Sequence, residues 1–172
     1  NDRYENSPVL WHLASRMAKA QGMSARAAEC LDRALALQFD HQPKEIDLDG
    51  FRKDYGELLG LFCEAAEEAS GSDAVLQNRL ISRIVRSADR WRSVDPQSEE
   101  VCRLAGAALA RCGAIDLAWD YLTSPLATEE QSSMDWPGLG ATYHGQGQYE
   151  LADRAYELAC AADPSNAELL WN

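Results

Sequence analysis

The side chains that most often carry out chemistry in proteins, cysteine and histidine, are scattered along this chain. The cysteines are Cys30, Cys63, Cys102, Cys112 and Cys160, and the histidines are His12, His41 and His144. The chain has no Cys-x-x-Cys pair, and no histidine stands at ligand spacing from another histidine or from a cysteine, whereas structural metal sites usually show such pairs. We therefore predict no metal site and no cofactor.

Catalysis by a thiol is also disfavoured by the local sequence. A nucleophilic thiol needs a nearby base or a helix N-terminus to lower its pKa, but "ECLDRAL" and "EVCRLAG" place Cys30 and Cys102 inside helical text without a neighbouring histidine. The five thiols are better explained as small buried side chains in a reducing compartment, which slightly favours a cytoplasmic protein. We predict that the chain is not an enzyme.

The acidic segment "FDHQPKEIDLDGF" at 39–51 is the remaining candidate for ion chemistry. An EF-hand loop would need a bidentate carboxylate six residues after Gly50, and Gly56 stands there instead. We therefore expect a long solvated loop that ends in a helix cap rather than a calcium site.

Composition excludes two further classes of function. The chain has 172 residues with 16 Lys plus Arg against 28 Asp plus Glu, a net charge of −12, which disfavours binding to phosphate backbones. The longest apolar runs, such as "AGAALA" at 105–110, fall far short of the roughly 20 residues that a bilayer requires. We expect neither nucleic-acid binding nor membrane insertion, and because the chain starts at Asn1 we expect an excerpt of a longer protein.

The elements that must position any site are helices, and the C-terminal stretch "WPGLGATYHGQGQYELADRAYELACAADPSNAELLW" is the clearest of them. Its key residues follow the order W-x2-L-G-x2-Y and then small, aromatic, small and proline positions: Trp136, Leu139, Gly140, Tyr143, Ala152, Tyr156, Ala159 and Pro164. This pattern resembles the tetratricopeptide repeat of 34 residues. Trp136 and Tyr143 are expected in the core, the small residues at close helix crossings, and "GQGQY" at the turn.

The same register recurs 34 residues earlier, where Gly140, Gly147, Ala152 and Tyr156 are matched by four residues: Gly106, Gly113, Ala118 and Leu122. A looser copy with Ser15 in place of the glycine lies near the N-terminus. Between them the pattern is longer, because 47 residues rather than 34 separate Tyr55 from Cys102. The predicted units are about 8–38, an irregular extended hairpin at 52–96, then 99–132 and 133–166, with a further helix starting at 167–172.

The resemblance implies an all-α fold, a right-handed superhelical stack of antiparallel helix pairs. It also implies a non-catalytic scaffold whose first helices line a concave groove that takes a protein or peptide. One subgroup of the family grips a C-terminal carboxylate with Lys, Asn and Arg, but the Asn residues are absent here, so we do not predict that clamp. The text "SADRWRSVDP" followed by "LAWDYLTSP" also resembles segments of very large uncharacterised bacterial proteins.

If the first helices line such a groove, most of their charged solvent-facing positions are basic: Arg16, Lys19, Lys53, Arg103, Arg111 and His144. Glu64 and Glu100 are the exceptions. The second helices carry acids: Glu29, Asp32, Asp116, Asp120, Glu150, Asp153 and Glu157. A basic groove inside an acidic shell would steer an acidic peptide inward.

Two alternatives stay open at this point. These charges are also what ordinary solvated helix faces carry, and the chain could instead be a structural spacer between flanking domains. The sequence does not indicate the partner's identity or the oligomeric state.

Overall fold

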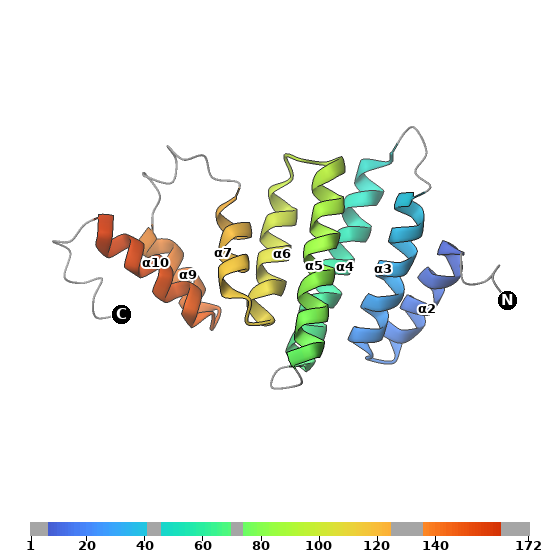
Figure 1. Cartoon of the computed structure of the whole chain (residues 1–172), viewed down its shortest axis with the longest axis horizontal. Coiled ribbons are helices and arrows are strands. Elements are labelled where there is room, and N and C mark those ends of the chain that lie inside the picture. Colours follow the sequence, from blue (N-terminus) through green and yellow to red (C-terminus); the bar gives the residue numbers. More distant parts are fainter. Residues whose placement is uncertain (1–6, 41–45, 70–73, 125–135, 163–172) are drawn as a thin grey trace. The chain divides into compact units, whose positions relative to one another are not determined.

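The computed structural model describes residues 7–40, 46–69, 74–124 and 136–162 (Figure 1). Within these ranges the chain forms eight α-helices and no strand, which confirms the all-α prediction. The helices are α2 (Pro8–Ala20), α3 (Ser24–Asp40), α4 (Leu48–Glu68), α5 (Ala74–Val94), α6 (Glu99–Arg111), α7 (Ile115–Thr123), α9 (Trp136–Gly145) and α10 (Tyr149–Ala162). The chain divides into two compact units, residues 1–122 and 123–172.

In the first unit, helices that follow one another in the sequence pack side by side and run in opposite directions (Figure 1). Helix α4 contacts α3, α5 and α6. Both helices of the middle hairpin, α4 and α5, have 21 residues, whereas α2 and α6 have 13. The extra length expected between Tyr55 and Cys102 is therefore helical.

The core of the first unit is aromatic around α4. Tyr55 stacks on Phe51 with ring centroids 4.4 Å apart and meets the edge of Trp91 at 6.4 Å. Phe62 and Trp91 are completely buried, and Tyr55 is 1% exposed. Large rings bury much apolar area at low conformational cost, so this cluster fixes α5 against α4.

The connection between α3 and α4 is shorter than the predicted loop at 39–51. Helix α3 continues to Asp40 and α4 already begins at Leu48, so the prediction was wrong at both ends. The reason at the second end is a cap: the carboxylate of Asp47 accepts a hydrogen bond from the backbone N–H of Gly50 at 3.3 Å. Such a cap satisfies a donor that the first turn leaves unpaired, and it draws Gly50 into the helix.

The 34-residue register corresponds to a repeated helix crossing. A Cβ atom at Gly106 would lie 2.5 Å from Cγ of Leu122, and a Cβ atom at Gly140 would lie 2.7 Å from Cε1 of Tyr156. Real Cβ atoms do not approach that closely, so both positions require glycine at the point where the second helix of the hairpin crosses the first. The crossing binds α6 to α7 in the first unit and α9 to α10 in the second.

At the equivalent helix crossing of the N-terminal hairpin, the residue is a serine instead of a glycine. Ser15 is 5% exposed, and its hydroxyl donates a 2.8 Å hydrogen bond to the carbonyl of Ala27, twelve residues on. At the corresponding place in the third hairpin, a Cβ at Gly106 would lie 3.2 Å from the carbonyl of Ala118, also twelve residues on. The serine therefore turns a close approach into a hydrogen bond, which explains why the looser copy tolerates a side chain.

Three of the hairpins turn on a glycine with a positive φ: Gly22 at 71°, Gly113 at 74° and Gly147 at 72°. L-residues with a side chain rarely adopt this left-handed conformation, which ends a helix in a tight turn.

The predicted burial of the small residues is confirmed, with Ala118, Ala152 and Ala159 at 0, 1 and 3% exposure. The right-handed superhelix and the continuous stack of four units stay predictions. Pro164 and the helix predicted to start at 167–172 lie outside the described ranges.

Candidate functional site

The described cysteines do not form a reactive site. All five thiols are free, and Cys30, Cys102 and Cys112 are buried. Burial raises the pKa of Cys30 and Cys63, and it raises the pKa of Cys112 to about 11, which disfavours the reactive thiolate near neutral pH. In the part of the chain that the structure describes, no three His, Cys, Asp or Glu side chains gather as a metal site would require.

The six residues predicted to bind a peptide are all exposed, and five of them lie in the first unit. Arg16 and Lys19 lie on α2, Lys53 on α4, and Arg103 and Arg111 on α6, all in the first unit. His144 lies on α9 of the second unit, where its ring meets Tyr149 edge-on at 5.3 Å.

Acidic residues of the same first helices pair with half of these six residues. Lys19 donates to Glu57 of α4 at 2.7 Å, and Arg111 of α6 pairs with Glu67 of α4. Arg103 lies 3.6 Å from Glu100 one turn earlier. Helix α4 thus supplies acids to both neighbouring first helices, and the charge on this face is mixed.

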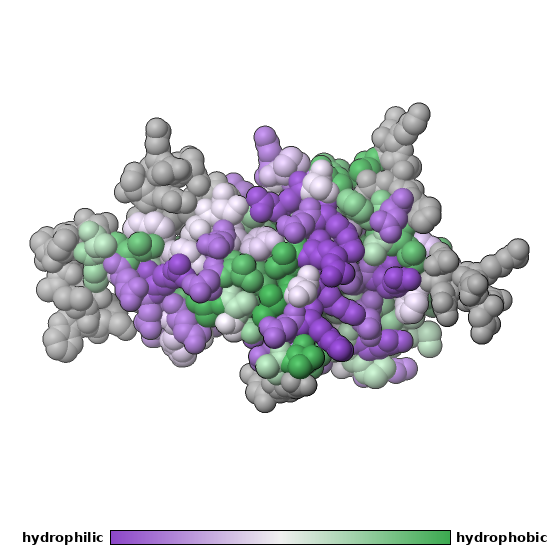
Figure 2. Space-filling model, viewed as in Figure 1, coloured by the Kyte–Doolittle hydropathy of each residue, from purple (hydrophilic) through white to green (hydrophobic). Residues whose placement is uncertain are grey.

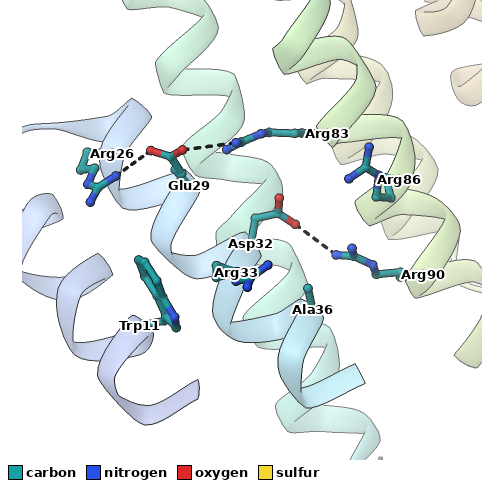
Figure 3. A pocket seen from close by; sticks show the side chains of 9 residues that line it. All are labelled: Trp11, Arg26, Glu29, Asp32, Arg33, Ala36, Arg83, Arg86 and Arg90. Atoms are coloured by element: carbon teal, nitrogen blue, oxygen red, sulfur yellow. Dashed lines mark hydrogen bonds and ion pairs between the residues drawn. The ribbon is translucent and has the colours of Figure 1, made fainter. Parts of the chain in front are cut away.

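A pocket of about 510 Å³ lies instead on the other helices of the first two hairpins (Figure 3). Two of its arginines, Arg83 and Arg90, reach from α5 towards α3, Arg86 lines it from α5, and a side chain of α2 lies beside it. Its lining residues are Trp11, Arg26, Glu29, Asp32, Arg33, Ala36, Arg83, Arg86 and Arg90. We call this site the arginine pocket. In the view of Figure 2, hydrophilic side chains gather over α3 and α5.

Two carboxylates of α3 hold three of the five guanidinium groups in the arginine pocket. Glu29 accepts hydrogen bonds from Arg26 at 2.8 Å and from Arg83 at 3.3 Å, and Asp32 accepts one from Arg90 at 3.1 Å. The Asp32 and Arg90 side chains are the least exposed of these pairs, at 14% and 18%. The two pairs to α5 therefore join α3 to α5 across the pocket.

The neighbouring arginines favour the charged form of Glu29. Burial pushes the pKa of Glu29 upward, but the hydrogen bonds from Arg26 and Arg83 outweigh it and lower the pKa overall. Beneath the pocket, burial raises the pKa of Tyr55 to about 12 against the opposing effect of the Arg90 guanidinium.

Two arginines of the pocket, Arg33 on α3 and Arg86 on α5, are exposed and have no ion pair within the described residues. Five arginines against two acids give the pocket lining a formal charge of +3, although the whole chain carries −12. The arrangement can therefore hold an anionic group between α3 and α5.

This site was not predicted from the sequence, because only the acidic residues of the second helices were considered and their arginines were not. The missing signal is the spacing of Arg79, Arg83, Arg86 and Arg90, which places four arginines on one face of a helix. Arg26 and Arg33 share a face of α3 in the same way. The premise of an acidic outer shell was therefore wrong for the first two hairpins, where arginines outnumber acids around the pocket.

The fold defines the class of the chain as an all-α protein of helical hairpins with a recurrent glycine crossing. None of the described helices is both long and apolar enough to span a bilayer. Residues 138–166 match the family model of the tetratricopeptide repeat, so the chain carries such a repeat over α9, α10 and the residues after them. No curated protein matches the chain. Tetratricopeptide repeats in general suggest a scaffold for protein interactions.

Proposed function

We propose that this chain is a non-catalytic scaffold that binds an acidic segment of another protein, and that the arginine pocket receives that segment. The observation that carries the proposal is the local reversal of charge, five arginines against two acids in a chain of −12. An acidic segment is repelled by most of such a surface and attracted to this part of it, so electrostatic steering selects the site.

The pocket also offers hydrogen-bond donors in a fixed arrangement. Arg83 and Arg90 are anchored by Glu29 and Asp32, so less side-chain entropy is lost when they bind a ligand. Arg33 and Arg86 have exposed guanidinium groups and can bind carboxylates through two parallel hydrogen bonds.

The face formed by the first helices is the second candidate for binding. Arg16 and Lys53 support it, because both are exposed and have no ion pair within the described residues. Its affinity for acids is expected to be lower, because Glu57 and Glu67 already neutralise Lys19 and Arg111. His144 would extend this face only if the two units stack as repeats do.

The scaffold is proposed to consist of four repeat units that correspond to the hairpins α2–α3, α4–α5, α6–α7 and α9–α10. The shared glycine turns and the equivalent crossings at Gly106 and Gly140 support this division. In the alternative of a spacer between flanking domains, the same stack would form without binding a partner.

Two double variants of equal charge change test the proposal. Arg33→Glu with Arg86→Glu alters the arginine pocket, whereas Arg103→Glu with Arg111→Glu alters the face formed by the first helices. Binding of a panel of fluorescent peptides rich in Asp and Glu is measured by anisotropy, and circular dichroism checks that each variant is folded. We expect the pocket variant to lose about tenfold or more in affinity and the other to change by less than about threefold.

The other outcomes decide between the alternatives. Loss of affinity only in the Arg103 and Arg111 variant would move the site to the first helices. Failure of every acidic peptide to bind the unaltered chain would reject the proposal in favour of the spacer.

A further inference from the structure

We propose that the arginine pocket recognises a phosphorylated side chain within the acidic segment of its partner. This inference rests on the proposed function and names the group that the pocket selects. The chemistry is that of a phosphate monoester, which presents three acceptor oxygens and a charge near −2 at neutral pH.

The first argument is the balance of charge inside the pocket. With a lining of +3, one carboxylate would neutralise a third of the excess, whereas a phosphate monoester would neutralise about two thirds. Glu29 and Asp32 already form carboxylate ion pairs with Arg83 and Arg90. A carboxylate ligand would therefore only repeat an interaction that the pocket already contains. A phosphate dianion would bring a second negative charge on one group, which neither carboxylate of the pocket carries.

The second argument is the number of unused donors. A guanidinium group has five N–H donors, and Arg83 and Arg90 each use one hydrogen bond to α3. Arg86 lies between them along α5, and Arg33 lines the pocket from α3 (Figure 3). Donors supplied from both helices suit a group with three acceptor oxygens better than a planar carboxylate with two.

The third argument concerns the size of the pocket and its margin. A volume of about 510 Å³ falls within the range of sites that hold whole side chains or small ligands, roughly 300 to 1,000 Å³, and exceeds what one ion fills. Trp11 is half-buried at the margin and supplies an apolar surface for the chain that carries the phosphate. A short protein segment fits a pocket of this size with an apolar margin better than RNA does. The net charge of −12 would repel a long phosphate backbone outside the pocket.

The test compares three peptides that differ at one central residue in the same acidic sequence: serine, glutamate and phosphoserine. We expect the phosphoserine peptide to bind the unaltered chain about tenfold more tightly than the glutamate peptide, with the serine peptide weakest. Arg33→Lys with Arg86→Lys keeps the charge but removes the fork geometry, so it should reduce the advantage of phosphoserine over glutamate to about threefold or less.

The matched control for that variant is Arg16→Lys on α2, outside the pocket, which should leave the ratio unchanged. A second readout is pH, because the second pKa of the phosphate is about 6. Between pH 5.5 and pH 7.5 the affinity of the phosphoserine peptide should rise while that of the glutamate peptide stays level. The glutamate peptide also controls for any effect of pH on the protein itself.

Three results would overturn the inference. Equal binding of the glutamate and phosphoserine peptides would leave an acidic-segment scaffold without phosphate selection, so the proposed function would survive alone. Tighter binding of an RNA oligonucleotide, or displacement of the peptide by millimolar inorganic phosphate alone, would assign the pocket to another anion. Failure of all three peptides to bind would remove both proposals together.

Discussion

At the scale of single residues, the glycine at each helix crossing is fixed by the side chain that lies against it. Gly106 and Gly140 occupy equivalent places, and in each case the opposing group is bulky, Leu122 in one hairpin and Tyr156 in the other. The sequence predicted that Gly140 stands where two helices approach closely, and the 34-residue register places Gly106 at the equivalent position. It did not predict how Ser15 fits the same place, since the hydrogen bond to Ala27 depends on the orientation of one hydroxyl.

Gly106→Ala should destabilise the chain by about 1 to 3 kcal/mol, because the new methyl group would overlap Leu122 and force α6 away from α7. Urea unfolding followed by circular dichroism measures the change. Gly60→Ala is the matched control, since Gly60 lies inside α4 with no atom within 4 Å of a new Cβ. It should stabilise the chain by about 0.5 to 1 kcal/mol through helix propensity. Equal effects of the two substitutions would contradict the crossing.

The residue types and spacing along α5 predict one part of the arginine pocket but not the neighbour that completes it. Arg83, Arg86 and Arg90 can be placed on one helical face from their spacing. That this face meets Glu29 and Asp32 of α3 depends on how the first two hairpins pack, and the extended middle hairpin breaks the 34-residue register needed to infer it.

At the scale of elements, the helices were predictable because apolar periodicity and small-residue spacing both indicate them. The predicted unit at 99–132 contains α6 (Glu99–Arg111) and α7 (Ile115–Thr123). The loop at 39–51 was predicted too long, because its proline, glycine and acids suggest a turn while the cap at Asp47 lets α4 begin early. Local composition therefore located the break between hairpins but not its bounds.

The glycine turn of the last hairpin gives a test at this scale. Gly147→Ala should destabilise α9 and α10 by about 1 to 2 kcal/mol, because its φ of 72° is strained for a residue with a side chain. Gly145→Ala, two residues earlier and equally open to solvent, should cost nothing measurable, since its φ is not positive. Hydrogen exchange of the α9 and α10 amides reports the difference, and similar protection in both variants would argue against the turn.

A pair between elements makes stability depend on pH. The Arg52 guanidinium of α4 donates a 2.7 Å hydrogen bond to Asp95, which follows α5, and this bond lowers the pKa of Asp95. Because the folded-state pKa is depressed, the pair stabilises the fold above the unfolded pKa of about 4, and the contribution is lost as pH falls through the folded-state pKa. Asp95→Asn should therefore be less stable than the unaltered chain at pH 7, and the difference should shrink below pH 4.

Urea midpoints from pH 2.5 to pH 7 measure that convergence. Glu100→Gln is the control, since its partner Arg103 lies one turn away and both side chains are more than half exposed, at 54% and 67%. An exposed pair contributes little, so its midpoint should follow the unaltered chain throughout. A constant deficit for Asp95→Asn at every pH would show that the carboxylate acts through packing rather than charge.

At the scale of the whole molecule, the arginine pocket carries positive charge although the net charge of the chain is negative. The net charge of −12 suggested an acidic exterior with basic residues gathered on the first helices. In the structure the first helices mix both signs through the pairs of Lys19 with Glu57 and Arg111 with Glu67, whereas the second helices of the first two hairpins carry the arginine pocket. Net charge constrains which partners approach, but only the packing of helices decides where they bind.

Amide chemical-shift mapping tests directly whether a partner binds between α3 and α5, as proposed. The isotope-labelled full chain is titrated with the tightest acidic peptide of the panel, and shift changes are assigned along the described helices. We expect the largest changes to cluster in α3 and α5 around Arg33 and Arg86. Changes centred on α2, α4 and α6 near Arg16 and Lys53, or no saturable change at all, would contradict it.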